Sequence, residues 1–327
     1  MKKIIFGLFA VMSVFAYSQE IDLWEKSSPT VSMGYTGFEI GGKYYNKSIK
    51  NVNEIQRFLD EVYSLRNTIN NDLKERAIFD TQEKDWILNT NVSYLKYENL
   101  KTPIYSINYG VLNDITRYGL SLSMFDGDSK LKIREYDTTG GQVNLYFNRN
   151  EELGNLFGTL YIGKNRQEFK ENTEDIDNLY YGYFTSLEQK YESFNIDEFY
   201  SGYFLTLDIS KVETDYNLAY NGKTLKAEID SDSIDTEFGI LFEKIFYVAM
   251  DTQVSVKLAS SIGKEFKDEN KYKEQGKEEF EFYNKNKLEI ISKIGTSGDI
   301  FTGIEYRKSM VTSNSENNIY LGFKINF

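Results

Sequence analysis

Hydrophobic and polar residues alternate along most of the chain beyond residue 86. Between residues 86 and 97, polar Asn89, Asn91 and Ser93 lie on one face, and the other face is apolar, with Trp86, Leu88, Val92 and Tyr94. A period of two over about ten residues is typical of strands that have one face against an apolar medium. The same alternation marks residues 105–111, 118–124, 142–148, 234–243 and 248–258.

A soluble β-sandwich would show this alternation too, but three observations favour a membrane. The polar faces carry charges and amides in nearly every segment, as a wet lumen would require. Tyr and Phe lie near the segment ends, as expected of aromatic girdles. The connections are unequal, because residues 264–287 are long and charged whereas residues 296–299 are a tight turn. The pattern predicts an all-β transmembrane antiparallel β-barrel of about 12 strands over residues 84–327.

The last segment has an apolar residue at every second position. These residues are Ile319, Leu321, Phe323, Ile325 and the terminal Phe327. A terminal aromatic residue on such a strand resembles the C-terminal signature by which the barrel-assembly machinery recognises its outer-membrane clients. A C-terminal edge strand of a soluble sheet is the alternative, but it would leave a long hydrophobic edge unpaired. Closure into a barrel pairs that edge.

Residues 51–77 have a different period. Apolar residues recur at spacings of three and four, at Val52, Ile55, Leu59, Val62, Ile69 and Leu73, with Arg66 at the one polar place in this stripe. The spacing predicts an amphipathic helix of about 37 Å. That length exceeds a bilayer core of about 30 Å, so the helix is long enough to cross the membrane inside the pore. A coiled-coil segment is the alternative, since the spacing also fits heptads.

The N-terminus predicts export. Lys2 and Lys3 precede an apolar run over residues 4–14, and Ala16 and Ser18 are the small residues of a cleavage site before Gln19. We therefore expect residues 1–18 to be a cleaved signal peptide and the protein to reach the outer membrane of a Gram-negative-type bacterium. The run is shorter than the roughly 20 residues of a membrane anchor. Residues 19–50 contain a short β-rich segment, a minimal passenger or a periplasmic piece.

Composition excludes several kinds of chemistry. The chain has no Cys and no His, which removes disulfides, thiolate nucleophiles, imidazole metal sites and Ser-His-Asp catalysis. We expect no enzymatic activity, no catalytic or metal-binding residues and no cofactor. The formal net charge of −12 makes nucleic acid an unsuitable partner. The expected partners are outer-membrane lipids, the barrel-assembly machinery and periplasmic chaperones, and we expect a monomeric barrel.

Two stretches carry a resemblance to a known family. Residues 214–225, with an Asn-Gly turn at Asn221, and the Asp-Ser-rich residues 230–236 resemble the autotransporter β-domain, as does the strand of residues 235–246 that follows. The resemblance implies that the Asp-Ser-rich residues form a hairpin. The ending over residues 318–327 resembles the family's last strand. The resemblance covers residues 70–327 and implies a twelve-stranded barrel with an N-terminal helix through its pore.

One further motif belongs to this resemblance. Some autotransporters cut themselves between two adjacent asparagines of the pore helix, and Asn70-Asn71 resembles that site in its order along the chain. The alternative is chance, because Asn is common here and a second pair occurs at Asn317-Asn318.

The sequence leaves the function open among a few hypotheses. Residues 19–50 are too few for the stacked repeats of a solenoid passenger, so we expect no ordinary passenger. The first hypothesis is an autotransporter-type translocator that anchors or exports this short segment. The second is a porin-like, cation-preferring channel or a structural barrel. An adhesive role for the charged stretches 125–136, 165–177 and 264–287 competes with their being solvated loops.

Overall fold

The computed structural model describes the backbone of most of the chain. The described residues are 31–34, 37–40, 43–45, 52–77, 86–98, 100–131, 134–151, 154–170, 175–192, 196–220, 223–249, 252–267, 280–294, 298–311 and 315–326. The predicted signal peptide, residues 1–18, and the terminal Phe327 lie outside them.

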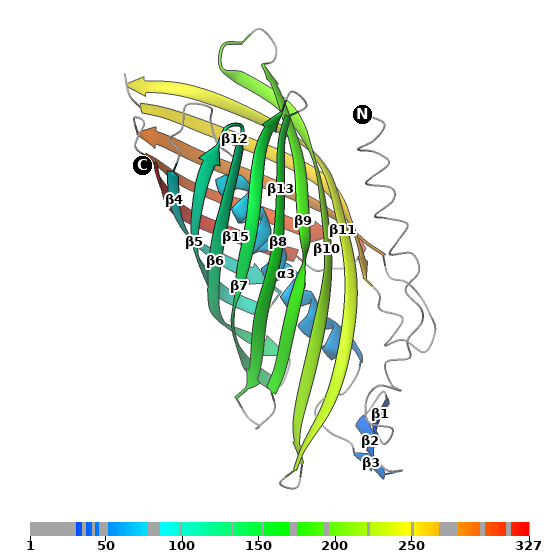
Figure 1. Ribbon diagram of the computed structural model, residues 1–327. Coiled ribbons are helices and arrows are strands. Elements are labelled where there is room, and N and C mark those ends of the chain that lie inside the picture. The colour runs from blue at the N-terminus through cyan, green and yellow to red at the C-terminus, as the bar shows by residue number, and fades with distance from the viewer. Residues whose placement is uncertain are drawn as a thin grey trace.

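Twelve antiparallel strands of the described chain close into one barrel, in sequence order and with β15 pairing back to β4. Figure 1 shows the tilted strands around the lumen. This confirms the predicted fold class and strand number. The strands are β4 (Trp86–Tyr97), β5 (Leu100–Asn113), β6 (Thr116–Leu131), β7 (Arg134–Glu151), β8 (Gly154–Phe169), β9 (Asp175–Glu192), β10 (Phe199–Tyr220), β11 (Lys223–Ala249), β12 (Thr252–Lys267), β13 (Phe280–Ile294), β14 (Gly298–Ser309) and β15 (Ser315–Asn326).

The alternation follows from the closed sheet. Along β4, buried and more exposed residues take turns, with Asn89, Asn91 and Ser93 buried in the lumen. The outward face is apolar, and large hydrophobic side chains such as Leu145 and Leu160 are about 60% exposed there (62% and 60%). Only a lipid environment makes such a continuous apolar exterior favourable, because water would penalise it.

Two predicted segment boundaries are wrong. Residues 248–258 do not form one strand: β11 ends at Ala249 and β12 begins at Thr252. The Asp-Ser-rich residues 230–233 do not form a hairpin either, because they lie within β11 and pair with β10. At the first boundary the alternation continues across a chain reversal. At the second, polar residues within a strand resemble those of a turn. Periodicity alone therefore marks neither boundary.

The predicted charged loops are shorter than expected. The stretch 125–136 is mostly strand, with Phe125–Leu131 in β6 and Tyr136 in β7. Likewise β8 continues to Phe169 and β9 begins at Asp175. Charged residues face outward at these strand ends, which extend beyond the belt of apolar, lipid-facing side chains. These residues are charged because they meet water, and their charge does not indicate a loop.

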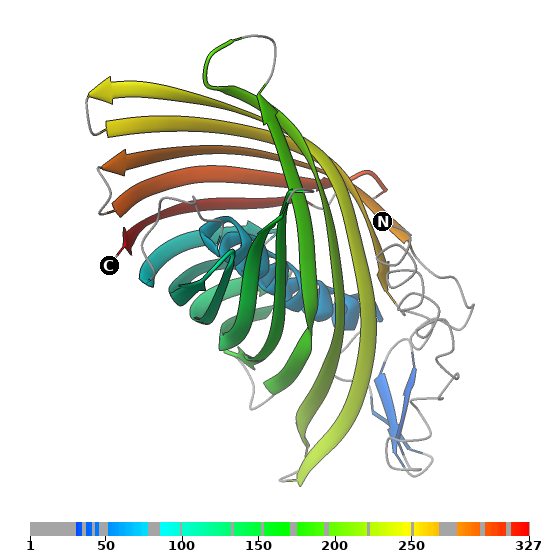
Figure 2. The same ribbon diagram turned by 45° about the horizontal axis from the view of Figure 1, so that its top comes forward.

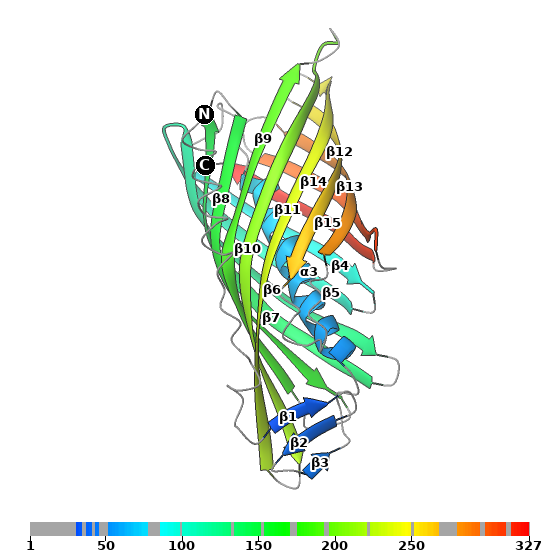
Figure 3. The same cartoon turned by 90° about the vertical axis from the view of Figure 1, so that its right-hand side faces the viewer.

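Helix α3 (Val52–Ala77) lies inside the barrel. Figures 2 and 3 show it passing along the lumen, enclosed by the strands. One side of the helix, with Val62 and Leu73, packs on aromatic side chains of β7–β9, including Phe157 and Tyr180, and on Val212 of β10. Another side packs Ile69 with residues of β4–β6. The predicted helix and its place in the pore are therefore confirmed.

A separate small antiparallel sheet precedes the helix. It consists of β1 (Val31–Gly34), β2 (Gly37–Ile40) and β3 (Lys43–Tyr45), in that order. These strands lie within the segment 19–50, for which the sequence predicted β structure.

Within the described residues, no helix has the length and hydrophobicity needed to cross a membrane.

Candidate functional site

The two ends of the barrel differ, and we name them by their connections. The first residue of β4, Trp86, and the last of β15, Asn326, share what we call the terminal end. The opposite end, which we call the loop end, carries the connections β4–β5, β6–β7, β8–β9, β10–β11, β12–β13 and β14–β15, because adjacent strands are antiparallel. The connection after Lys267 at the loop end is the longest between barrel strands.

Helix α3 enters the lumen at the loop end. Towards the N-terminal end of the helix, Glu61 accepts hydrogen bonds through Oε1 from Ser129 Oγ (3.0 Å) and Tyr136 Oη (2.5 Å). Its other oxygen accepts one from Gln167 Nε2 (3.3 Å). These partners flank the β6–β7 connection and the end of β8. The carboxylate is fully buried, so these hydrogen bonds replace its lost hydration.

The helix finishes towards the terminal end. Arg76 pairs with Glu289 of β13, and its guanidinium lies 3.6 Å from the ring centroid of Phe301. Phe301 is near the start of β14, which is at the terminal end. Tyr320 donates a hydrogen bond to Glu289 (3.1 Å) and completes the surroundings of Arg76. The chain therefore runs from the loop end to the terminal end before β4 begins.

Arg66 anchors the middle of the helix. Its Nε lies 3.2 Å from Asp208 Oδ2 of β10, and the guanidinium donates to Ser210 and, at 3.2 Å, to Ser233. Tyr161 donates to the other oxygen of Asp208 (2.6 Å). The sequence showed Arg66 only as a polar interruption of the stripe, and that interruption was the signal of an inward ionic anchor.

A second charged cluster lies near the end of the helix. Lys257 Nζ is 3.0 Å from Glu75 of the helix and 3.2 Å from Glu188 of β9. Lys287 Nζ is 3.3 Å from the other oxygen of Glu75. All four side chains are at most 8% exposed. The helix thus supplies one carboxylate to the two wall cations Lys257 and Lys287, and it adds Lys74, whose Nζ is 3.3 Å from Glu75.

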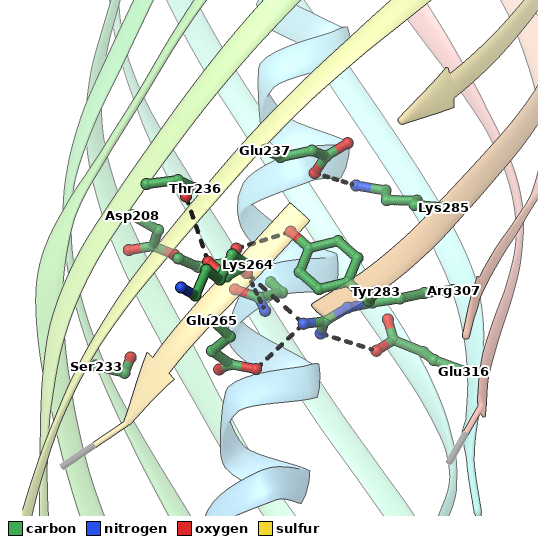
Figure 4. Close-up of polar contacts among 12 residues, drawn as sticks. Asp208, Ser233, Thr236, Glu237, Lys264, Glu265, Tyr283, Lys285, Arg307 and Glu316 are labelled. Atoms are coloured by element: carbon green, nitrogen blue, oxygen red, sulfur yellow. Dashed lines mark hydrogen bonds and ion pairs between the residues drawn. The ribbon is translucent and has the colours of Figure 1, made fainter. Parts of the chain in front are cut away.

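A third cluster belongs mainly to the wall and is drawn in Figure 4. Arg307 lies 3.1 Å from Glu265, 3.7 Å from Glu316 and 3.8 Å from the ring centroid of Tyr283. The helix joins this cluster through Thr68, which donates to Glu316 (3.2 Å). Beside it, Lys285 pairs with Glu237 (3.3 Å).

On the opposite side of the lumen, neutral side chains of the wall bind the helix. Asn70 accepts hydrogen bonds through Oδ1 from Gln142 (2.8 Å) and Asn144 (3.0 Å) of β7. Asp72 accepts one from Asn91 of β4 (3.0 Å). The helix is therefore held by ions on the β9–β15 side and by amides and hydroxyls on the β4–β8 side. No regular pattern in the sequence indicates this division.

The predicted site residues have definite places. Of the apolar stripe, Leu59, Val62, Ile69 and Leu73 are buried, whereas the side chains of Val52 and Ile55 lie outside the described residues. Asn70 is fully buried and Asn71 is half-buried, with its Nδ2 donating to the backbone oxygen of Asn67 (2.8 Å). In β15 the side chains of Ile319, Leu321, Phe323 and Ile325 face lipid.

Little space remains between the helix and the charged wall. Two cavities there have volumes of about 20 Å³ and about 10 Å³. Each is of the size of about one water molecule. Among the described residues there is no cluster of three or more carboxylates arranged to hold a metal ion. The arrangement is suited to holding a helix in a polar pore.

These features define a class: a transmembrane β-barrel of the outer-membrane type whose lumen is filled by a helix of the same chain. No protein-family model and no curated protein sequence matches the chain. The structure is similar to the β-domain of the Bordetella autotransporter BrkA, with a TM-score of 0.58, 14% identity and coverage of 75% of this chain and all of that domain (100%). It is also similar to the translocator domain of the autotransporter NalP from Neisseria meningitidis, with a TM-score of 0.57, 11% identity and coverage of 82% and 98%. At these identities the similarity is one of fold, and the resemblance to the autotransporter β-domain is confirmed at that level.

Proposed function

We propose that this protein is an autotransporter-type translocator barrel that holds its N-terminal segment on the outer side of the membrane. In this proposal α3 is the part of the exported chain that remains in the pore after transport. The function is non-catalytic. The direction of α3 in the lumen is the observation that supports it most strongly.

That direction follows from the anchors at the two ends of the helix. Glu61 is bonded beside the β6–β7 connection at the loop end, and Arg76 is bonded near the start of β14 at the terminal end. The residues before the helix must therefore leave the barrel at the loop end. A helix inserted from the periplasm as a plug would not need to have its N-terminus at the loop end.

The positions of the outward charges indicate which end is extracellular. On β8, the lipid-facing Leu160 and Ile162 are followed by Lys164 and then Arg166 towards the loop end. At the terminal end the outward apolar positions continue to Ile325, the last but one residue of β15. Strands that extend beyond the apolar band, and longer connections, are typical of the extracellular end.

A tag after Gln19 tests the proposal. On intact cells we expect the tag to bind antibody and to be removed by added protease. A matched control has the tag in the connection 295–297 at the terminal end, where we expect no labelling until the outer membrane is permeabilised. A tag after Gln19 that is protected in intact cells and exposed only on permeabilisation would contradict the proposal.

A second candidate is a cation-preferring channel, and the lumen wall supports it. Among the buried side chains of the described strands, carboxylates outnumber cationic groups. The carboxylates are Glu188, Asp208, Asp235, Glu237, Glu265, Glu289, Glu305 and Glu316, and the cationic groups are Arg117, Lys257, Lys285, Lys287 and Lys324. An acidic lining favours cations. Planar-bilayer recording separates the two candidates, since a translocator closed by α3 has low conductance and a channel has high conductance.

Export and assembly complete the proposal. We infer that residues 1–18 are removed as a signal peptide, after which chaperones pass the chain to the barrel-assembly machinery. The alternating lipid-facing residues of β15, the strand that closes the barrel, also support recognition by the barrel-assembly machinery. The expected final state is a monomeric barrel in outer-membrane lipid, and N-terminal sequencing of the purified protein, with Gln19 first, tests the cleavage.

A further inference from the structure

The lipid-facing surface has a groove on the side formed by β11–β15. Its volume is about 460 Å³. This lies within the range of about 300 to 1,000 Å³ that small-molecule sites occupy. The groove is on the outside of the barrel, away from α3, so it does not depend on the translocator function.

Two neighbouring rows of side chains line the groove across the five strands. Cross-strand pairing places the first row in line, and all its members are apolar: Phe242, Leu258, Leu288, Ile304 and Ile319. Leu288 is half-buried between its more exposed neighbours Leu258 and Ile304, so it forms the floor. This row offers hydrocarbon contacts along the whole width of the groove.

The second row, one step closer to the loop end, is mostly polar. It contains Ile240, Ser260, Asn286, Tyr306 and Asn317. Ser260 donates to Asn286 Oδ1 (2.9 Å), and Asn286 donates to Asn284 (2.5 Å). Amides and hydroxyls on a lipid-facing surface are costly because hydrocarbon offers them no hydrogen bonds. A ligand with polar groups at this level would satisfy the remaining donors.

Positive charge follows at the next level. Lys308 pairs in register with Asn284 and is exposed on the same outward face of β14 as Tyr306. On β12, Lys264 lies 4.8 Å from the ring centroid of Phe282. Along one direction the surface therefore passes from aliphatic to amide and hydroxyl, and then to ammonium groups. This is the polarity sequence of an acyl lipid that has a phosphate in its headgroup.

We propose that this groove binds one acyl lipid with a phosphorylated headgroup. The acyl chain lies along the row of Leu288, the ester or amide oxygens accept hydrogen bonds near Asn286, and the phosphate pairs with Lys308. The headgroup then points to the loop end, as it must for a lipid of the leaflet on that side.

A second copy of the chain fits the groove less well. A two-fold contact places the same surface on both partners. Two copies of this groove facing each other would leave their apolar floors apart, with an empty space between them. The contact would also bring two copies of Lys308 close together, and like charges repel. A narrow lipid chain fills the concave surface without either penalty.

Native mass spectrometry of the full-length protein in detergent tests the proposal, with short-chain phosphatidylglycerol as the added probe. We expect one tightly bound lipid per barrel. Phosphatidylcholine of equal chain length is the second probe, because its headgroup has a phosphate but no net charge, and we expect at least fivefold weaker binding. Ile304→Trp, which fills the groove, should lower the affinity for phosphatidylglycerol at least tenfold, and Lys308→Gln should remove most of the preference for it.

The matched controls are Leu122→Trp on β6, a lipid-facing site on another part of the barrel, and Lys164→Gln on β8. Neither should change lipid binding. The heat-dependent shift of the band in SDS gels shows that each variant is folded. Equal binding by wild type and Ile304→Trp would overturn the proposal, and so would a dimer that Ile304→Trp dissociates in the absence of lipid.

Discussion

The Nε of Arg66 lies 3.2 Å from Oδ2 of Asp208, and both side chains are almost completely buried between the helix and β10. Removing one partner of a buried pair leaves an uncompensated charge, which costs about 3 to 5 kcal/mol. We therefore expect Arg66→Met to lower the free energy of unfolding by about this amount. Urea titration followed by the heat-modifiable shift in SDS gels measures the change.

Two further variants make the test specific for this pair. Arg66→Met leaves the carboxylate of Asp208 without its partner, and Asp208→Leu removes that carboxylate. The double variant should therefore lose less stability than the sum of the losses in the two single variants. Arg149→Met is the surface control, since Arg149 is 47% exposed and pairs with Glu151 at 2.9 Å. It should cost at most about 1 kcal/mol. If the losses in the free energy of unfolding from the two buried substitutions simply add, the Arg66–Asp208 ion pair contributes no coupling free energy.

Removing residues 19–77 should open the pore. The helix occupies the lumen, and the wall that its removal exposes has more buried carboxylates than buried cationic groups. In planar bilayers we expect the full-length protein to be nearly closed and the deleted form to conduct with a preference for K⁺ over Cl⁻. The expected rise in conductance is tenfold or more, and equal conductance of the two forms would show that the helix does not close the pore.

The direction of the helix can be tested with cysteine pairs, because the native chain has none. Asp72 and Asn91 are joined by a 3.0 Å hydrogen bond, and Glu61 and Gln167 by one of 3.3 Å. We expect Asp72→Cys with Asn91→Cys, and Glu61→Cys with Gln167→Cys, to be joined by a short bifunctional thiol reagent in intact membranes.

The mismatched pair, Asp72→Cys with Gln167→Cys, is the control. Glu61 and Asp72 are separated along the helix by a rise of about 16 Å, so a short reagent cannot connect a thiol introduced at Asp72 to a residue beside Glu61. Crosslinked chains migrate differently after heating, which provides the measurement. If the helix ran in the opposite direction, the mismatched pair would be crosslinked and the two matched pairs would not.

The Asn70-Asn71 bond is predicted to remain intact. It lies within a continuous helix, and Oδ1 of Asn70 is held by Gln142 and Asn144. Attack of the Asn70 amide on its own carbonyl would require the helix to open and these hydrogen bonds to break. On SDS gels we expect a single chain in the wild type and in Asn70→Ala. A fragment that starts at Asn71 and disappears in Asn70→Ala would show that self-cleavage does occur.

Much of the architecture could be predicted from local patterns in the sequence. Alternation at Trp86, Leu88, Val92 and Tyr94 indicates a strand between lipid and lumen, because successive side chains point to opposite faces. Spacings of three and four at Leu59, Val62, Ile69 and Leu73 indicate a helix for an equally local reason. Both periods depend only on backbone geometry, so the barrel class and the pore helix follow from sequence.

The ends of strands were less predictable. β11 and β12 alternate in the same phase across their connection, so residues 248–258 resembled one strand. The polar residues 230–233 of β11 resembled a turn, but Ser231 and Ser233 are buried in the lumen, where Ser233 accepts a hydrogen bond from Arg66 of the helix. In each case the medium around the residue decided its character, and the medium depends on position in the barrel.

The sequence by itself determined that this chain forms a lipid-facing barrel and an amphipathic helix, since each follows from a repeat of two, three or four residues. Only the tertiary structure decided that Arg66 is the central anchor, because its partner Asp208 is distant in sequence. It alone also decided the direction of the helix, through Glu61 and Arg76, and the row from Leu288 to Lys308 that forms the groove. Such contacts depend on which strands become neighbours when the barrel closes, and no local period encodes that.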